Sequence, residues 1–134
     1  MSTILIVDDD DQLRLSFHKL LAEEGYTVES AAAGDAAVKK VEKKAPDLVI
    51  LDMRLPGMNG LEAFRSIHRM EPKLPVIIMT AYATVETAVQ ALRLGAFDYI
   101  QKPFDIDHLK HRVKTALKMG VRPRAEITDA AMGE

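Results

Sequence analysis

The chain has 134 residues, of which 48% are hydrophobic and 28% charged, and its formal net charge is −2. These values predict one soluble globular domain with a sizeable core, and the charge does not mark the chain as one that binds nucleic acid directly. Cysteine is absent, which excludes disulfides, thiolate metal sites and a cysteine nucleophile. Acidic residues begin soon after the start of the chain, so we expect no signal peptide or membrane segment there and a cytoplasmic location.

A strand and a helix are predicted first. An apolar run at 4–7 leads into four consecutive aspartates, and apolar residues then recur at helical spacing. Asp10 or Asp11 can cap this helix and complement its dipole, and Gly25 stands where a helix terminator belongs. The first two aspartates therefore directly follow a strand.

The second and third units have the same order. A weaker, alternating strand is expected at 27–31, followed by a small-residue helix from Gly34. A continuous apolar run at 47–51 then predicts a strand buried on both faces, with Asp52 at its carboxyl end. Asp52 can simply begin a turn, as Asp often does, or it can lie where open parallel sheets bind ligands.

The third helix begins near Asn59, with Glu62 placed three residues on as in a capping box. Another buried-type strand at 76–79 ends in Thr80 and Ala81. Thr80 is thus the third polar position at a strand end, after Asp8 with Asp9 and after Asp52.

The final strand is predicted between the last two helices of the sequence. Thr84 can cap the first of them and Gly95 can end it, after which a strand is expected at 97–100. This strand leads into Lys102, and Asp105 caps a closing helix whose apolar positions again have helical spacing.

Five strand–helix units predict an α/β fold of the flavodoxin-like type. Right-handed crossovers make it a doubly wound, five-stranded parallel sheet of order 2-1-3-4-5 with helices on both faces. We expect this domain to occupy residues 1–119. Residues 120–134 lack apolar periodicity and are interpreted as a tail or the start of a linker.

Polar residues follow strands one, three, four and five of this fold, namely Asp8 and Asp9, Asp52, Thr80 and Lys102. Because the carboxyl ends of parallel strands meet at one edge, these side chains are expected to gather there. Three carboxylates in one pocket repel one another unless a cation is bound. Oxygen-only ligands without His or Cys suit Mg²⁺.

Such a site can carry out phosphoryl transfer. A carboxylate beside Mg²⁺ can attack a phosphoryl group and form an acyl phosphate, which makes Asp52 a candidate nucleophile. The transferring group needs charge neutralisation and hydrogen-bond donors. Lys102 can supply the cation, and the Thr80 hydroxyl and the Ala81 amide can supply the donors.

These motifs carry a family resemblance that runs from about residue 3 to residue 118. The sequence resembles the receiver domain of two-component response regulators, the CheY-like family, on residues 6–10 (IVDDD), 51–60 (LDMRLPGMNG), 80–81 (TA) and 102–104 (KPF). Residues 80–84 (TAYAT) and 95–104 (GAFDYIQKPF) are similar to NtrC-type receivers. Those receivers usually precede an ATPase domain that activates transcription and a DNA-binding helix-turn-helix.

The resemblance implies a role for each site residue. Asp52 would accept a phosphoryl group from the phosphohistidine of a histidine kinase. Asp8, Asp9 and Asp52 would bind Mg²⁺ together with the backbone carbonyl of Arg54. Lys102 would contact the phosphoryl oxygens.

The resemblance also implies a switch. Thr80 would move toward the phosphoryl group and Tyr99 would turn inward behind it, although a half-buried strand favours a Tyr in any case. The peptide bond from Lys102 to Pro103 is expected to be cis. The output face would be helix four, strand five and helix five, with a homodimer through helices four and five as one outcome.

Other functions remain open on the residues themselves. Aspartate-nucleophile phosphatases carry a second acid two residues after the nucleophile, where this chain has Arg54. A flavin-binding protein would need a phosphate-cradling first loop, which four aspartates oppose. A receiver that only docks partners would be expected to have lost Asp52, Thr80 or Lys102. Control of transcription is the expected output, and a stand-alone receiver or a phosphorelay intermediate is the alternative.

The predicted protein modifies itself rather than a diffusible substrate, since it would catalyse its own phosphorylation and dephosphorylation. Water must reach the acyl phosphate in line for it to hydrolyse. Arg54 and Tyr82 lie two residues beyond Asp52 and Thr80, at the expected rim of the pocket. Both side chains are large, which predicts a comparatively long-lived phosphoryl group.

Overall fold

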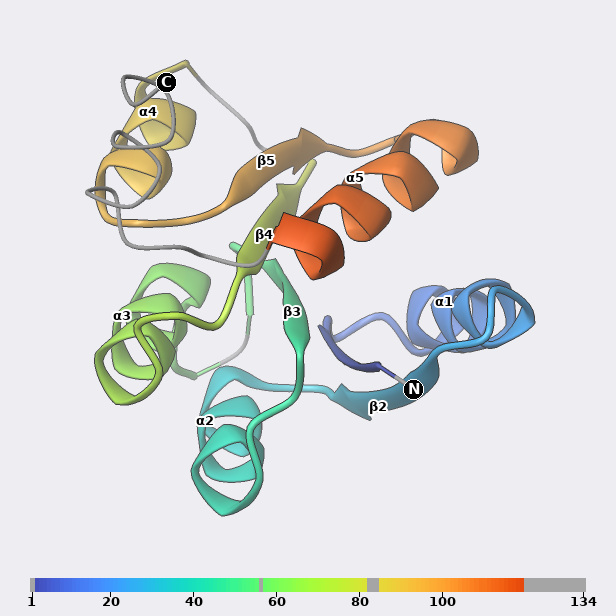
Figure 1. Cartoon of the computed structure of the whole chain (residues 1–134). Helices are drawn as coiled ribbons and strands as arrows, with labels where there is room; N and C mark the ends of the chain where they lie inside the picture. The colour runs from blue at the N-terminus through green and yellow to red at the C-terminus, as the bar shows by residue number, and fades with distance from the viewer. Residues whose placement is uncertain (1, 56, 82–84, 120–134) are drawn as a thin grey trace, which may run out of the picture.

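The computed structural model describes residues 2–55, 57–81 and 85–119. Their five strands form one parallel sheet of order β2-β1-β3-β4-β5, which confirms the predicted doubly wound α/β fold (Figure 1). In chain order the elements are β1 (Thr3–Val7), α1 (Asp11–Glu23), β2 (Thr27–Ala31), α2 (Gly34–Lys43), β3 (Leu48–Asp52), α3 (Gly60–Met70), β4 (Val76–Thr80), α4 (Val85–Arg93), β5 (Asp98–Gln101) and α5 (Ile106–Met119).

Helices cover both faces of the sheet, because successive side chains of a buried strand point to opposite sides. In β1, Leu5 and Val7 join the core cluster under α2, α3 and α4. Ile4 and Ile6 join the cluster under α1 and α5. In Figure 1 these two groups of helices lie to the left and to the right of the sheet.

The pairing of the strands brings their carboxyl ends together. Val7 of β1 is in register with Leu51 of β3, so the residues that follow, Asp8 and Asp52, are neighbours across two strands. Asp52 itself pairs with Met79 of β4 and is the last residue of β3. The strand therefore runs one residue later than the predicted range 47–51.

The loop between β3 and α3 folds back tightly onto the end of β3. The capping box is confirmed, since Glu62 N–H donates to Asn59 Oδ1 at 2.9 Å and Asn59 N–H donates to Glu62 Oε1 at 3.3 Å. A Cβ at Gly60 would lie 2.3 Å from the backbone oxygen of Asp52 and 2.5 Å from the Cα of Met53. Only glycine fits this close approach of two backbones.

Side-chain caps also start the helices at the two ends of the domain. Asp10 Oδ1 accepts hydrogen bonds from the backbone N–H groups of Gln12 and Leu13, which selects Asp10 over Asp11 as the cap of α1. Asp105 likewise accepts from the N–H of Asp107, at 2.8 Å, as expected. The predicted cap at Thr84 and the tail at 120–134 lie outside the described residues.

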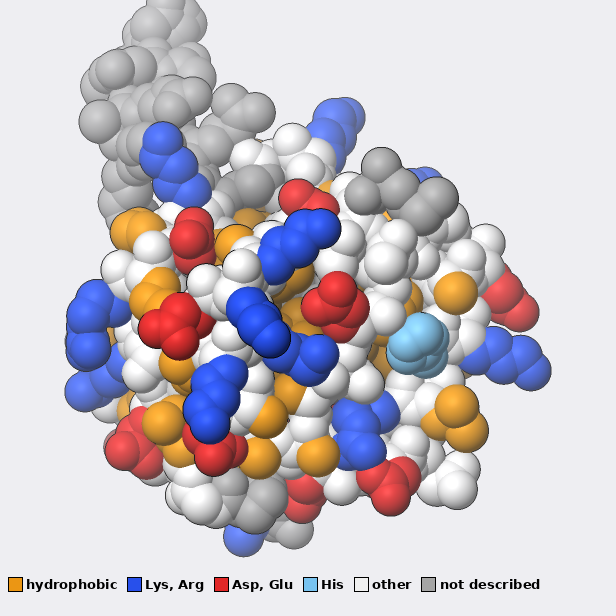
Figure 2. Space-filling model, turned by 90° about the horizontal axis from the view of Figure 1, so that it is seen from below, with side chains coloured by type: hydrophobic (Ala, Val, Ile, Leu, Met, Phe, Trp, Pro, Cys, Tyr) orange, Lys and Arg blue, Asp and Glu red, His pale blue; other side chains and the backbone are white. Residues whose placement is uncertain are grey.

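The outer surface on one side of the molecule carries both signs of charge. Figure 2 shows acidic and basic side chains intermixed there rather than in one block of a single sign. Among the described helices, none is long and apolar enough to cross a membrane.

Candidate functional site

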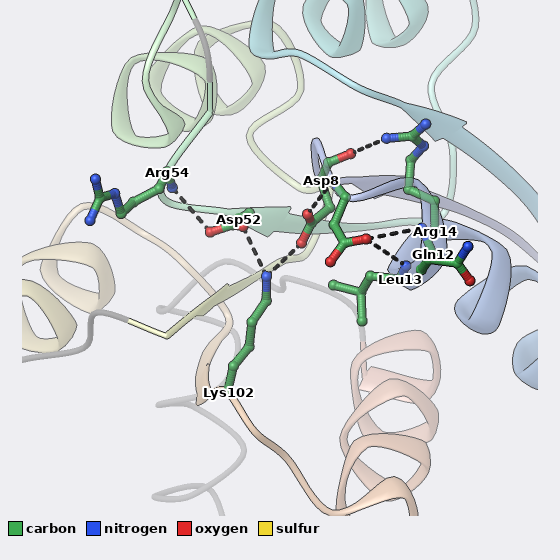
Figure 3. Close-up of polar contacts among 8 residues, drawn as sticks. Asp8, Gln12, Leu13, Arg14, Asp52, Arg54 and Lys102 are labelled. Atoms are coloured by element: carbon green, nitrogen blue, oxygen red, sulfur yellow. Dashed lines mark hydrogen bonds and ion pairs between the residues drawn. The ribbon is translucent and has the colours of Figure 1, made fainter.

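Three charged side chains meet at the carboxyl edge of the sheet (Figure 3). Lys102 Nζ, just after β5, donates hydrogen bonds to Asp8 Oδ2 at 2.7 Å and to Asp52 Oδ2 at 2.9 Å. Each of the three comes two positions after an isoleucine that packs in the core cluster under α1 and α5, namely Ile6, Ile50 and Ile100. Because side chains alternate along a strand, the three charged residues share the same side of the sheet. The structure thus brings together the acids after β1 and β3 and the lysine after β5, as the strand order predicted.

The site is sheltered, so its charges interact strongly. Asp8 is 0% exposed and Asp52 5% exposed. Burial raises the pKa of Asp52, and the negative charge of Asp8 adds to this, while the hydrogen bonds from Arg54 N–H and Lys102 lower it only in part. Burial alone would lower the pKa of Lys102, but its hydrogen bonds and ion pairs with the two acids raise it overall. Lys102 thus serves as the counter-ion of both carboxylates.

Asp9 extends the acidic group toward solvent. One carboxylate oxygen each from Asp8, Asp9 and Asp52 lies within 4.8 Å of the others, and Asp9 is exposed while the other two are buried. The pKa of Asp52 is raised because its carboxylate is buried beside that of Asp8. A cation bound between the two would stabilise their ionised forms. These donors are all hard oxygens, with one open side, so the residues present fit Mg²⁺.

Arg54 and Thr80 flank Asp52 in different ways. The backbone N–H of Arg54 donates to Asp52 Oδ1 at 3.0 Å, whereas its side chain is exposed and extends away from the carboxylate (Figure 3). Thr80 is the buried last residue of β4, 1% exposed, and Ala81 beyond it is exposed. Tyr82, predicted to lie at the rim, is outside the described residues.

Tyr99 is half-buried in β5 and touches α4. Its hydroxyl lies 3.2 Å from Thr87 Oγ1, a hydrogen bond between β5 and the first turns of α4. Its ring packs against the core cluster under α2, α3 and α4. The side chain is therefore already turned partly inward, and its predicted switch role stays a prediction.

Two further features lie in the loop after Lys102. The peptide bond from Lys102 to Pro103 is cis, as expected. The ring of Phe104 packs on that of Phe17 in α1, with 5.3 Å between the ring centroids. This packing ties the lysine loop to the helix that follows the acidic residues.

Arg14 of α1 was not singled out from the sequence. It donates a hydrogen bond to the backbone carbonyl of Asp8 at 2.6 Å and pairs with the carboxylate of Asp11. The i, i+3 spacing from Asp11 could have predicted the second contact, but the first depends on how the loop after β1 folds back over the helix.

This fold and this edge of acids and lysine define a receiver domain of the response-regulator type. The family model described as the response regulator receiver domain matches residues 4–114 of the sequence, and the chain belongs to that family.

Curated relatives agree with the NtrC-type resemblance. Regulatory protein AtoC of Escherichia coli K12 is 44% identical over 119 residues, which are 89% of this chain and 26% of that protein. The DNA-binding transcriptional regulator NtrC of Salmonella typhimurium is 40% identical over 114 residues, or 85% of this chain and 24% of that protein. The chain thus spans about a quarter of the length of these relatives.

Two solved receiver structures share this fold over nearly their whole length. A CheY-like receiver domain protein from Methanospirillum hungatei has a TM-score of 0.86 and 36% identity, covering 89% of this chain and 95% of that one. The receiver domain of NtrX from Brucella abortus has a TM-score of 0.81 and 38% identity, covering 86% of this chain and 98% of that one.

Proposed function

We propose that this domain accepts a phosphoryl group on Asp52 from the phosphohistidine of a histidine kinase. The observation that carries the proposal is the arrangement of Asp8, Asp52 and Lys102, in which one ammonium bridges two buried carboxylates of adjacent strands. Membership of the receiver family supports the two-component setting.

The transfer is a substitution at phosphorus. A carboxylate oxygen of Asp52 forms a bond to phosphorus while the phosphorus–nitrogen bond of phosphohistidine breaks, and the electron pair leaves with the imidazole, which takes a proton from solvent. Lys102 pairs with negative charge on the phosphoryl oxygens. The Ala81 amide and the Thr80 hydroxyl serve as hydrogen-bond donors. Later attack by water on phosphorus returns the Asp52 carboxylate and free phosphate.

Asp8, Asp9, Asp52 and the backbone carbonyl of Arg54 would hold Mg²⁺. When bound, Mg²⁺ neutralises charge on the phosphoryl oxygens as they approach three acids. The protein residues orient the nucleophile, since Arg54 N–H holds one Asp52 oxygen and Lys102 holds the other. The domain thereby promotes its own phosphorylation and dephosphorylation rather than the turnover of a diffusible substrate.

An aspartate-nucleophile phosphatase is the rival enzyme class. It needs an acid near the leaving group, two residues after the nucleophile. That position holds Arg54, whose side chain points away from Asp52 (Figure 3). The geometry therefore favours a phosphoacceptor.

Phosphorylation would change the surface formed by α4, β5 and α5. Thr80 lies at the end of β4 and Tyr99 joins β5 to α4, so movement of Thr80 toward the phosphoryl group would be passed to α4. The output would be transcription, as the name of the relative NtrC, a DNA-binding transcriptional regulator, suggests. A homodimer through α4 and α5 is one way to reach it, and a stand-alone cytoplasmic receiver is the alternative.

The test is incubation with a small phosphodonor such as acetyl phosphate, with and without Mg²⁺, read by intact mass. We expect the gain of one phosphoryl group in the wild type, and no gain in Asp52→Asn or in EDTA. A gain that persists in Asp52→Asn would reject Asp52 as the acceptor. For the output, gel filtration with and without beryllofluoride should show a change in mass, and an unchanged mass would reject dimerisation as the response.

A further inference from the structure

Arg14 holds the loop that carries the two acids after β1. Its Nη1 donates to the backbone carbonyl of Asp8 at 2.6 Å, and its Nη2 pairs with the Asp11 carboxylate. The Arg14 side chain is 19% exposed and that of Asp11 86% exposed, so the contact to the Asp8 carbonyl is the sheltered one. Figure 3 shows the guanidinium beside Asp8, away from Lys102.

This contact fixes the peptide group before Asp9. A peptide unit is planar, so a hydrogen bond to the Asp8 carbonyl also fixes the direction of the Asp9 N–H. The peptide group after Asp9 is fixed as well, because the N–H of Asp10 donates to Asp8 Oδ1 at 2.9 Å. Asp9 therefore lies between two peptide groups whose orientations are both held.

The direction of the Asp9 side chain depends on these two peptide groups because the side chain itself is exposed. A buried acid such as Asp8 is oriented by the groups around it, whereas an exposed carboxylate takes its direction from the backbone. With both neighbouring peptide groups held, the Cα–Cβ bond of Asp9 points in one direction, from which one carboxylate oxygen lies within 4.8 Å of one oxygen each from Asp8 and Asp52.

We propose that Arg14 is a positioning residue for Mg²⁺ binding, which acts by holding the Asp8–Asp9 peptide group. The inference rests on the proposed function, since it concerns the same metal site. Groups that orient metal ligands without touching the metal commonly change its affinity by about 10-fold to 100-fold when they are removed.

Simple electrostatics makes the opposite prediction. Arg14 is a cation near three acids, so its charge alone opposes the binding of Mg²⁺, and its removal would tighten binding. The ion pair with Asp11 offsets that charge locally. The sign of the change in affinity therefore separates positioning from charge.

The experiment is a titration of the folded domain with Mg²⁺ alone, followed by NMR of the backbone amides, for the wild type and three variants. Arg14→Met keeps an unbranched apolar stem but removes charge and donors, and we expect about tenfold weaker binding. Arg14→Lys keeps the charge and one donor, and we expect an intermediate affinity, which is a partial rescue. Asp11→Asn leaves the contact with Asp8 and should stay within about twofold of the wild type.

A second readout excludes a merely structural role. The rate of phosphorylation by acetyl phosphate should fall in Arg14→Met at low Mg²⁺ and return toward the wild-type rate at saturating Mg²⁺. Unchanged or tighter Mg²⁺ binding in Arg14→Met overturns the inference, and if that variant does not fold, an Arg14→Lys affinity equal to the wild type overturns it. A wild type that binds no Mg²⁺ overturns the proposed metal site itself, which distinguishes the two failures.

Discussion

Replacing Asp52 by Asn should stabilise the domain when Mg²⁺ is absent, although it removes an ion pair. Asp52 is 5% exposed and lies among like charges, and its pKa is raised chiefly by burial. Above that pKa the carboxylate is ionised in both the folded and the unfolded chain, so the folded state bears the cost of the buried charge. Asn has no such cost and is close to Asp in shape.

The size of the effect follows from opposing terms. Asp52 lies within 4.8 Å of the Asp8 carboxylate and 2.9 Å from Lys102 Nζ. At an effective dielectric constant of about 20, the first pair repels by roughly 3 kcal/mol and the second attracts by roughly 6 kcal/mol. The two pairs together leave a net attraction of roughly 3 kcal/mol. Burying the carboxylate costs several kcal/mol, which exceeds this net attraction. We expect a net gain on the order of 1 kcal/mol, or about 3 to 6 °C in Tm.

The assay is thermal unfolding in EDTA and in Mg²⁺, over a range of pH. The advantage of Asp52→Asn should shrink as the pH falls through the raised pKa of Asp52, because the wild-type carboxylate then takes up a proton. Mg²⁺ should stabilise the wild type more than the variant, which has lost a ligand. Glu29→Gln, at an exposed acid of the edge strand β2, is the control and should change Tm little. A lower Tm for Asp52→Asn in EDTA at neutral pH would refute the reasoning.

Three further changes test other features. Gly60→Ala should lower the free energy of unfolding by about 2 to 3 kcal/mol in urea titrations, since its Cβ would meet the backbone of Asp52 at 2.3 Å; an unchanged midpoint would contradict this. Asn59→Ala should cost about 1 kcal/mol in the same assay through loss of the capping box, and a midpoint equal to that of the wild type would contradict this cost. Arg54→Ala combined with Tyr82→Ala should shorten the lifetime of phosphorylated Asp52, measured by intact mass over time, and an equal lifetime would remove the shielding hypothesis.

The fold was readable from the sequence because each buried strand is a short apolar run followed by a polar break. The alternation within those runs also indicates which residues share a face. Asp8, Asp52 and Lys102 each lie two positions after a residue that faces α1 and α5. Strand order and side-chain alternation together therefore predict that the three side chains come into contact. The capping box at Asn59 was equally predictable, since both its partners lie within one helical turn.

Other parts of the site depend on loop geometry, which spacing does not encode. One ammonium can bridge two acids at similar distances only because of the side-chain directions at the ends of three strands, which spacing does not give. The hydrogen bond between Thr87 and Tyr99 joins a helix face to a strand across a turn, and its register is set by packing. Arg14 could have been paired with Asp11 from sequence, but not with the carbonyl of Asp8.

The lysine that bridges two acids also sets the charge that the site presents through its cycle. Three carboxylates and one ammonium leave two negative charges uncompensated. In the proposed cycle one Mg²⁺ brings this edge of the sheet to neutrality, and a phosphoryl dianion that converts the Asp52 carboxylate to a mixed anhydride adds one net negative charge. The phosphorylated domain would thus differ from the Mg²⁺-bound one by a single charge. The change that a partner detects would then come from new contacts of Lys102 and Thr80 more than from the net charge of the site.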